Sequence, residues 1–68
     1  MTDKQIVQHT NALAQRFYEM QGCAITGRYK FYRATHPAER LCWDMAVAAM
    51  EHIAKTDVEK ALKETGIK

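Results

Sequence analysis

One stretch of the sequence decides the fold: residues 35–55, THPAERLCWDMAVAAMEHIAK. Its proline suits the first position of a helix, where a missing N–H costs nothing, and the proline ring disfavours helical geometry at the preceding residue. Glu39 follows in the first turn, where the helix dipole favours a negative charge. The stretch therefore predicts a helix over about 37–55, with Thr35 or His36 at its cap.

The predicted helix over 37–55 is apolar around most of its circumference. Its charged residues share one narrow stripe that only Val47 interrupts, and they are Arg40, Asp44, Glu51 and Lys55. Stripe members four residues apart carry opposite charges and form two pairs worth about 0.2–0.5 kcal/mol each. Because a helix of this kind is typical of the centre of a fold, we predict a long apolar central helix with Trp43 in the core.

Two shorter elements of sequence predict the remaining helices. Thr2 or Asp3 is a suitable cap for a helix over about 3–20, and Gly22 follows it as a residue that adopts positive φ easily. A third helix is expected over about 57–65, where Thr56 and Glu59 have capping-box spacing. The predicted fold class is all-α, a small three-helix domain that spans residues 1–68.

The first predicted helix carries two neighbouring apolar stripes. The narrower stripe consists of Ile6, Leu13, Phe17 and Met20, and the second of Val7, Ala14 and Tyr18. Together they are wider than one neighbouring helix covers. We therefore expect something further to pack against this helix.

A second copy of the chain is the simplest cover for these apolar surfaces. A chain of 68 residues is short, and domains below roughly 70–80 residues rarely gain more than about 3–5 kcal/mol from one core. We predict a symmetric homodimer, a dimeric helical bundle. Its expected interface residues lie on the first and central helices and are Val7, Tyr18, Ala46, Met50 and Ile53.

Composition favours a soluble, cytoplasmic protein with no membrane segment. Ten Lys and Arg against eight Asp and Glu give a net charge of +2, and 47% of the residues are hydrophobic. No apolar run approaches the roughly 18 residues that a membrane helix needs, and the polar start of the chain is unlike a secretory signal.

The cysteines and histidines predict neither a cofactor nor a metal site. Cys23 and Cys42 are expected as thiols in a reducing compartment, although one disulfide between them is the alternative. Together with His36 and His52 they show no spacing typical of metal ligands. A Cys42 nucleophile would need a base that a third group orients, and no such set is evident, so we expect no enzymatic activity.

The connection between the first two predicted helices, residues 23–35, shows no helical period and is expected to be irregular or a short extended segment. No acidic residue occurs from residue 20 to residue 38. Basic residues alternate there with aromatic ones, and the candidate partner-binding residues are Arg28, Tyr29, Lys30, Tyr32 and Arg33.

This basic and aromatic segment has two interpretations. Interleaved cations and rings are able to hold phosphates and stack bases, or to bind an acidic protein. Alternatively, the rings of Tyr29, Phe31 and Tyr32 cover the helices while the cations face water. Three cations neutralise few phosphates, so a protein partner is favoured over nucleic acid.

Residues 36–49, HPAERLCWDMAVAA, resemble a segment in short uncharacterised proteins carried by phages and prophages. The His-Pro start and the tryptophan followed by alanines carry the likeness, which covers about a fifth of the chain. The resemblance implies a small accessory protein of a bacterial mobile element that acts on a host protein. The sequence thus predicts a non-enzymatic interaction protein that binds a protein partner as a homodimer, with weak nucleic-acid binding through residues 28–33 as the alternative.

Overall fold

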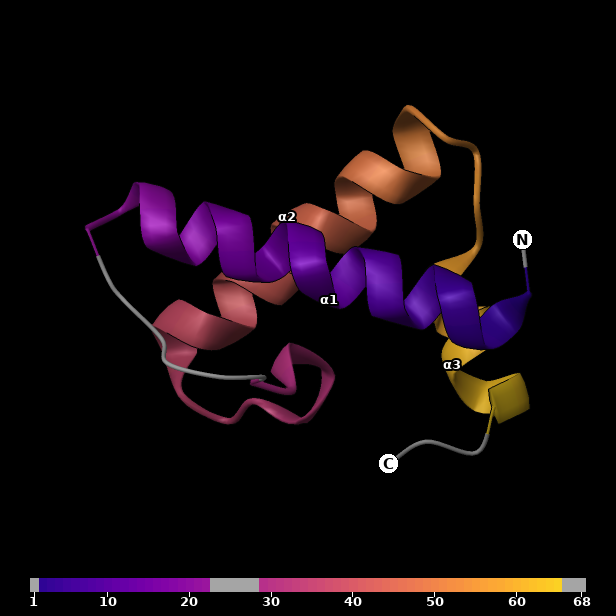
Figure 1. The fold of residues 1–68 in the computed structure, drawn as a ribbon, viewed down its shortest axis with the longest axis horizontal. Coiled ribbons are helices and arrows are strands. Elements are labelled where there is room, and N and C mark those ends of the chain that lie inside the picture. Colours follow the sequence, from indigo (N-terminus) through magenta and orange to yellow (C-terminus); the bar gives the residue numbers. More distant parts are fainter. Residues whose placement is uncertain (1, 23–28, 66–68) are drawn as a thin grey trace.

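The computed structural model describes residues 2–22 and 29–65. They form the helices α1 (Asp3–Met20), α2 (Pro37–His52) and α3 (Val58–Thr65), with a short 3-10 helix, η1 (Phe31–Arg33), before α2. No strand occurs within these two ranges. Figure 1 shows α1 crossing in front of α2, with α3 beside the N-terminal half of α1. The predicted all-α, three-helix fold is confirmed.

Helix α1 begins and ends where its local signals predict. The amide of Gln5 donates to Thr2 Oγ1 at 3.2 Å, and the amide of Thr2 donates to Gln5 Oε1 at 2.9 Å, so the two residues form a capping box. After Met20 the chain leaves the helix through Gly22, whose φ of +87° suits a residue without Cβ.

Helix α2 begins at Pro37 as predicted, and His36 is its cap. The His36 Nδ1 atom accepts a hydrogen bond from the amide of Ala38 at 3.3 Å. The helix ends at His52, three residues before the predicted end near Lys55. Lys55 has a φ of +52°, in the left-handed region, so it does not continue the helix.

The early end of α2 has a physical reason. Ile53 is 83% exposed and Ala54 and Lys55 are also exposed, so no packing stabilises another turn. The predicted helical pair of Glu51 with Lys55 loses its spacing as a result. The other predicted pair is present, with Arg40 Nε 3.7 Å from Asp44 Oδ1.

Helix α3 has a different cap from the predicted one. Asp57 Oδ1 accepts from the amide of Lys60 at 2.9 Å, so the helix proper starts at Val58. The predicted capping box of Thr56 with Glu59 is therefore wrong. The Thr56 hydroxyl instead donates to the carbonyl of Ala54 at 3.2 Å, within the preceding turn.

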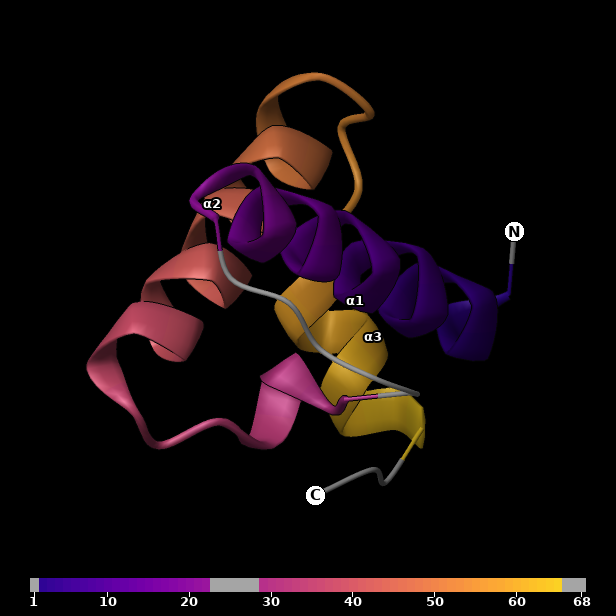
Figure 2. The same cartoon turned by 60° about the vertical axis from the view of Figure 1, so that its left-hand side comes forward.

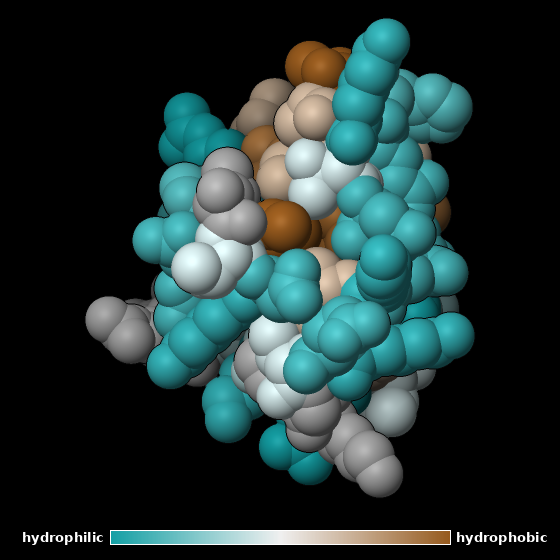
Figure 3. Space-filling view, turned by 90° about the vertical axis from the view of Figure 1, so that its right-hand side faces the viewer, coloured by the Kyte–Doolittle hydropathy of each residue, from teal (hydrophilic) through white to brown (hydrophobic). Residues whose placement is uncertain are grey.

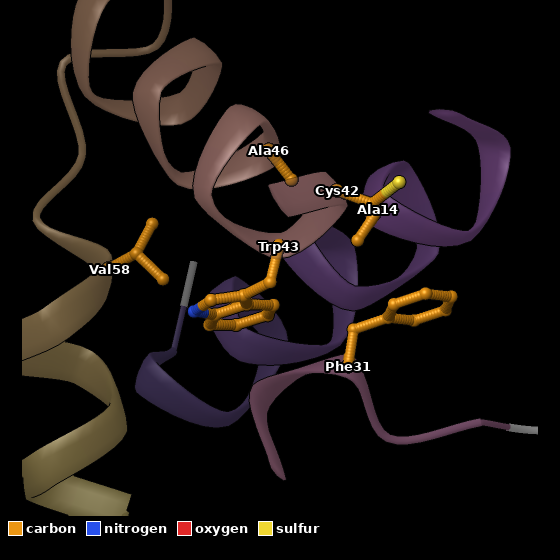
Figure 4. Close-up of a cluster of buried hydrophobic side chains, with 6 residues drawn as sticks. All are labelled: Ala14, Phe31, Cys42, Trp43, Ala46 and Val58. Atoms are coloured by element: carbon orange, nitrogen blue, oxygen red, sulfur yellow. The ribbon is translucent and has the colours of Figure 1, made fainter. Parts of the chain in front are cut away.

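The core joins side chains from every described element. Its buried cluster consists of Ala14, Phe31, Cys42, Trp43, Ala46 and Val58. Figure 4 shows the Trp43 indole between Val58 of α3 and Phe31 of η1. Trp43 is 3% exposed, which confirms its predicted place in the core.

The fully buried side chains of α1 lie on or beside its second predicted stripe, and Ile6, Leu13 and Phe17 of the narrower stripe are half-buried against the same core. Val7, Thr10 and Ala14 are buried, whereas Met20 of the narrower stripe is 71% exposed. Thr10 is tolerated inside because its hydroxyl donates to the carbonyl of Ile6 at 2.7 Å. Two helices, α2 and α3, pack against α1, so the chain itself covers most of both predicted stripes and leaves Met20 exposed.

The prediction that Val7 and Ala46 lie at an interface between two copies of the chain is wrong. Val7 and Ala46 are 1% and 0% exposed, because both are buried inside the chain itself. Tyr18 and Met50 are half-buried against the core, and Ile53 is exposed. Helix α2 buries only Cys42, Trp43 and Ala46 within the chain, so it is less enclosed than its sequence predicts.

The face of the molecule that Figure 3 shows is largely hydrophilic. Figure 3 shows the face that carries α3, where hydrophobic side chains reach the surface in the middle and near the top, by the end of α2. Within the described part of the chain, no helix combines the length and the apolar character that crossing a membrane requires.

We expect Trp43→Ala to abolish cooperative unfolding. Truncation of a buried tryptophan costs about 3–5 kcal/mol, comparable with the whole stability of so short a chain. Circular dichroism during thermal denaturation measures the effect. Arg16→Ala, at an exposed side chain of α1, is the matched control and should melt near the wild-type temperature. A cooperative transition within a few degrees of wild type for Trp43→Ala would contradict the central role of this residue.

Candidate functional site

A groove of about 530 Å³ lies between α1 and residues 29–32. Its volume falls in the range of ligand-binding clefts, roughly 300–1,000 Å³. The lining combines amide, tyrosine and lysine side chains: Gln8, Asn11, Ala12, Gln15, Tyr29, Lys30 and Tyr32. Three of the five residues predicted to bind a partner therefore lie together in one groove.

Asn11 holds the far wall of the groove in place. Its Nδ2 atom donates to the carbonyl of Tyr29 at 2.7 Å, and its Oδ1 atom accepts from the amide of Phe31 at 2.6 Å. One side-chain amide thus replaces a backbone partner for two peptide groups that no helix or sheet satisfies. This clamp fixes residues 29–31 against α1.

The aromatic rings fasten the same segment from the other side. Phe31 is fully buried, and its ring meets the edges or faces of Tyr29 and Tyr18 at centroid distances of 4.9 and 5.7 Å. The Tyr32 ring lies 5.9 Å from that of Trp43. The prediction that these aromatics cover the helices is confirmed, and Tyr29 and Tyr32 still expose part of their surface to the groove.

Tyr29 also connects the groove to the start of α2. A hydrogen bond from its hydroxyl to the Glu39 carboxylate raises the pKa of Tyr29, and partial burial and the charges of Glu39 and Tyr18 raise it further. Because this pKa is raised, the hydroxyl stays protonated at pH values above those at which a tyrosine ordinarily ionises. Its one hydroxyl proton is donated to Glu39, so toward the groove this hydroxyl is an acceptor.

The remaining cations of the predicted binding segment lie outside the groove. Arg33 is exposed on η1 and is not part of the lining. Arg28 falls outside the described residues. Lys30, which is exposed, is the one charged side chain that lines the groove within the described part of the chain.

The cysteine and histidine side chains are dispersed. Cys42 is buried, with Gln21 Nε2 at 3.5 Å from its sulfur, whereas Cys23 falls outside the described residues. His36 caps α2 and His52 lies exposed at its end. Within residues 2–22 and 29–65, no three His, Cys, Asp or Glu side chains gather in a way that could hold a metal ion.

A second hollow surrounds the turn between α2 and α3. Its volume is about 630 Å³, and its lining is Glu51, His52, Lys55, Thr56, Asp57 and Glu59. The lining mixes charges of both signs, and it contains no apolar residue and no ring other than the imidazole of His52. The groove beside α1 is therefore the stronger candidate for a binding site.

Sequence reasoning singled out the aromatic and basic residues of the groove but missed its amides. Asn11, Gln8 and Gln15 lie on α1 beside the buried face of Val7 and Ala14. A polar residue at the border of an amphipathic helix carries no local signal, because its partners are 18 and 20 residues away in the chain.

The chain has no match among models of known protein families, among curated proteins or among solved structures. The resemblance of residues 36–49 to phage proteins therefore stays a prediction.

We expect Asn11→Ala to destabilise the fold by about 1–3 kcal/mol, because two backbone groups lose their partner. Urea unfolding followed by Trp43 fluorescence measures the loss, and hydrogen exchange at the Phe31 amide should accelerate. Gln8→Ala removes a neighbouring amide with no partner among the described residues, so its effect should stay within about 0.5 kcal/mol. Equal stabilities of the two variants would show that Asn11 does not hold residues 29–31 in place.

The Glu39→Gln variant should lower the pKa of Tyr29 toward the usual value of about 10. Because the folded state raises this pKa, the stabilisation by the bond is complete at lower pH and is lost as the pH rises through the raised value. Tyrosinate absorbance during alkaline titration measures the shift, and Tyr29→Phe assigns the signal. Asp44→Asn on the same helix is the control. Identical titrations of the Gln and Asn variants would show that Glu39 has no such effect.

Proposed function

We propose that this chain is a small, non-enzymatic interaction protein that binds an extended, acidic segment of a partner protein in the groove between α1 and residues 29–32. One observation carries the proposal: the lining brings together two tyrosine rings, a lysine and three side-chain amides. The accessory role implied by the likeness to phage proteins agrees with such a function, as does a cytoplasmic location.

The amides of the groove suit a peptide backbone. Gln8 and Gln15 each have a donor and an acceptor, which match the two polar groups of a peptide unit, whereas Asn11 uses both of its groups to hold residues 29–31. Gln8 and Gln15 have no hydrogen-bond partner among the described residues, and they line the groove seven residues apart. Seven helical residues rise about 10 Å, the length of about three residues of extended chain.

Charge favours an acidic ligand. Lys30 is positive, and Arg33 adds a second exposed cation on the same segment. The nearby Glu39 carboxylate accepts from the Tyr29 hydroxyl rather than facing the groove unpaired. An aspartate or glutamate side chain beside Lys30 would therefore find a cation, and the tyrosine rings would cover its neighbours.

Nucleic acid is the alternative ligand for the same surface. The two cations that the described residues supply neutralise few phosphates, so such binding would be weak and would fall steeply with salt. Hydrogen bonds from the groove amides to a peptide depend less on ionic strength. Because amides outnumber cations in the lining, the groove favours a protein ligand.

The proposed function includes a homodimer. Among the residues that the structure describes, three large apolar side chains are exposed: Met20 at 71%, Leu41 at 54% and Ile53 at 83%. Association of two copies is a common way for a short chain to cover apolar surface.

The Lys30→Glu variant should weaken binding of a labelled acidic peptide roughly threefold to tenfold, since one exposed attraction becomes a repulsion. Fluorescence anisotropy with pooled acidic decapeptides and with oligothymidine, each at low and moderate salt, makes the comparison. Lys60→Glu carries the same charge change on α3 and should bind as the wild type does. Binding of oligothymidine alone, lost steeply with salt, would overturn the proposal in favour of nucleic acid.

A further inference from the structure

Ala12 leaves a notch in the α1 wall of the groove. It lies four residues after Gln8 and three before Gln15, so the three side chains share one face of the helix. Both glutamine side chains are long, whereas the alanine side chain ends at Cβ. Ala12 lines the groove and is exposed. Its methyl group is therefore open to a ligand.

Two tyrosine rings line the groove from the opposite wall. Figure 2 shows residues 29–33 below α1, at the start of the chain that leads round to α2. The Tyr29 ring lies at 89° to that of Phe31, and the Tyr32 ring at 67° to that of Trp43. Because Phe31 and Trp43 are buried, these contacts hold both tyrosines in place before a ligand binds. Both tyrosines are only half-buried, so part of each ring stays available in the groove.

The charge of Lys30 alone would give little affinity. Its side chain is exposed, and ion pairs between exposed groups are weak because water and salt screen them. Most of the binding energy of an interface comes instead from a few large side chains that enter pockets of the partner. Ala12 and the two tyrosine rings supply the apolar surface for such a contact. An acidic ligand therefore needs an apolar side chain as well.

We propose that the groove recognises an acidic segment that also carries one large apolar side chain, such as leucine or phenylalanine, which enters between Ala12 and the rings of Tyr29 and Tyr32. The inference rests on the proposed function and defines the partner sequence more closely. Ala12 is then the residue that determines specificity, because any longer side chain at this position would fill the notch. Lys30 favours acidic residues beside the apolar one.

The two glutamines agree with this placement. They have no hydrogen-bond partner among the described residues, so each is able to bind a peptide group of an extended ligand. Gln8 and Gln15 are about 10 Å apart along α1, a distance that about three extended residues span. Ala12 lies between them. A ligand side chain between the two bound peptide groups would therefore reach the notch.

Fluorescence anisotropy with three labelled decapeptides tests the proposal. The peptides have the same glutamates and differ only at one central position, which is phenylalanine, leucine or serine. The wild-type chain should bind the better of the two apolar peptides at least about tenfold more tightly than the serine peptide, because burial of a large apolar side chain is favourable by at least that factor. Equal binding of all three peptides would overturn the proposal.

The Ala12→Gln variant tests whether the notch is the site of this contact. Glutamine is neutral and a good helix former, and the position is exposed, so the fold should persist, which thermal denaturation checks. The variant should bind all three peptides equally, as weakly as the wild type binds the serine peptide. Ala48→Gln makes the same change at an exposed position of α2 outside the groove and should keep the wild-type preference. An unchanged preference in Ala12→Gln would place the apolar contact elsewhere, such as at the exposed Met20, Leu41 or Ile53, and would overturn the proposal.

The Lys30→Glu variant separates this inference from the proposed function. It should weaken binding of all three peptides alike and keep the apolar preference, because Lys30 and Ala12 contact different side chains of the ligand. If the peptides bind and depend on Lys30 but show no apolar preference, only the specificity assigned to Ala12 fails. If no peptide binds the wild-type chain at low or moderate salt, the proposed function fails and this inference fails with it.

Discussion

Burial of the Trp43 indole holds together parts of the chain that have little other reason to meet. Helix α3 is only eight residues long, and η1 forms a single turn, so neither is stable as an isolated helix. Trp43 packs with Val58 of the first and Phe31 of the second in one buried cluster, and its ring meets that of Tyr32. Because the chain is short, this one side chain supplies much of the apolar contact that offsets the cost of ordering those segments.

The groove depends on that core and on one further constraint. Residues 29–31 have peptide groups that no regular element satisfies, and Asn11 satisfies two of them from α1. Ring packing supplies the attraction, whereas the Asn11 amide determines where the backbone lies. The hydrogen bond of Tyr29 with Glu39 then joins the same segment to α2. Polar contacts of residues 29–31 with α1 and α2 thus position the candidate site, and the hydrophobic pattern of each helix does not indicate these contacts.

Whether the sequence predicts a feature of this fold depends on how far apart in the chain the interacting residues lie. Thr2, His36 and Gly22 act within four residues of themselves, so the starts of α1 and α2 and the exit from α1 are predictable from local chemistry. The burial of Thr10 and the Asn11 clamp are not predictable in this way. Thr10 suits the core because its hydroxyl has a backbone partner, and Asn11 has a structural role because its side chain binds a backbone group far away in the sequence. The end of α2 depends on packing that its last turn lacks, which no composition reveals.

The proposed homodimer has a functional consequence for the groove. A symmetric pair of chains would present two grooves, one on each copy. A partner with two acidic segments would then bind the second groove at an effective concentration that the first contact sets, often in the millimolar range for short connections. Weak single grooves of mostly polar lining would in this way give useful affinity, because a short chain has too little surface for one large interface.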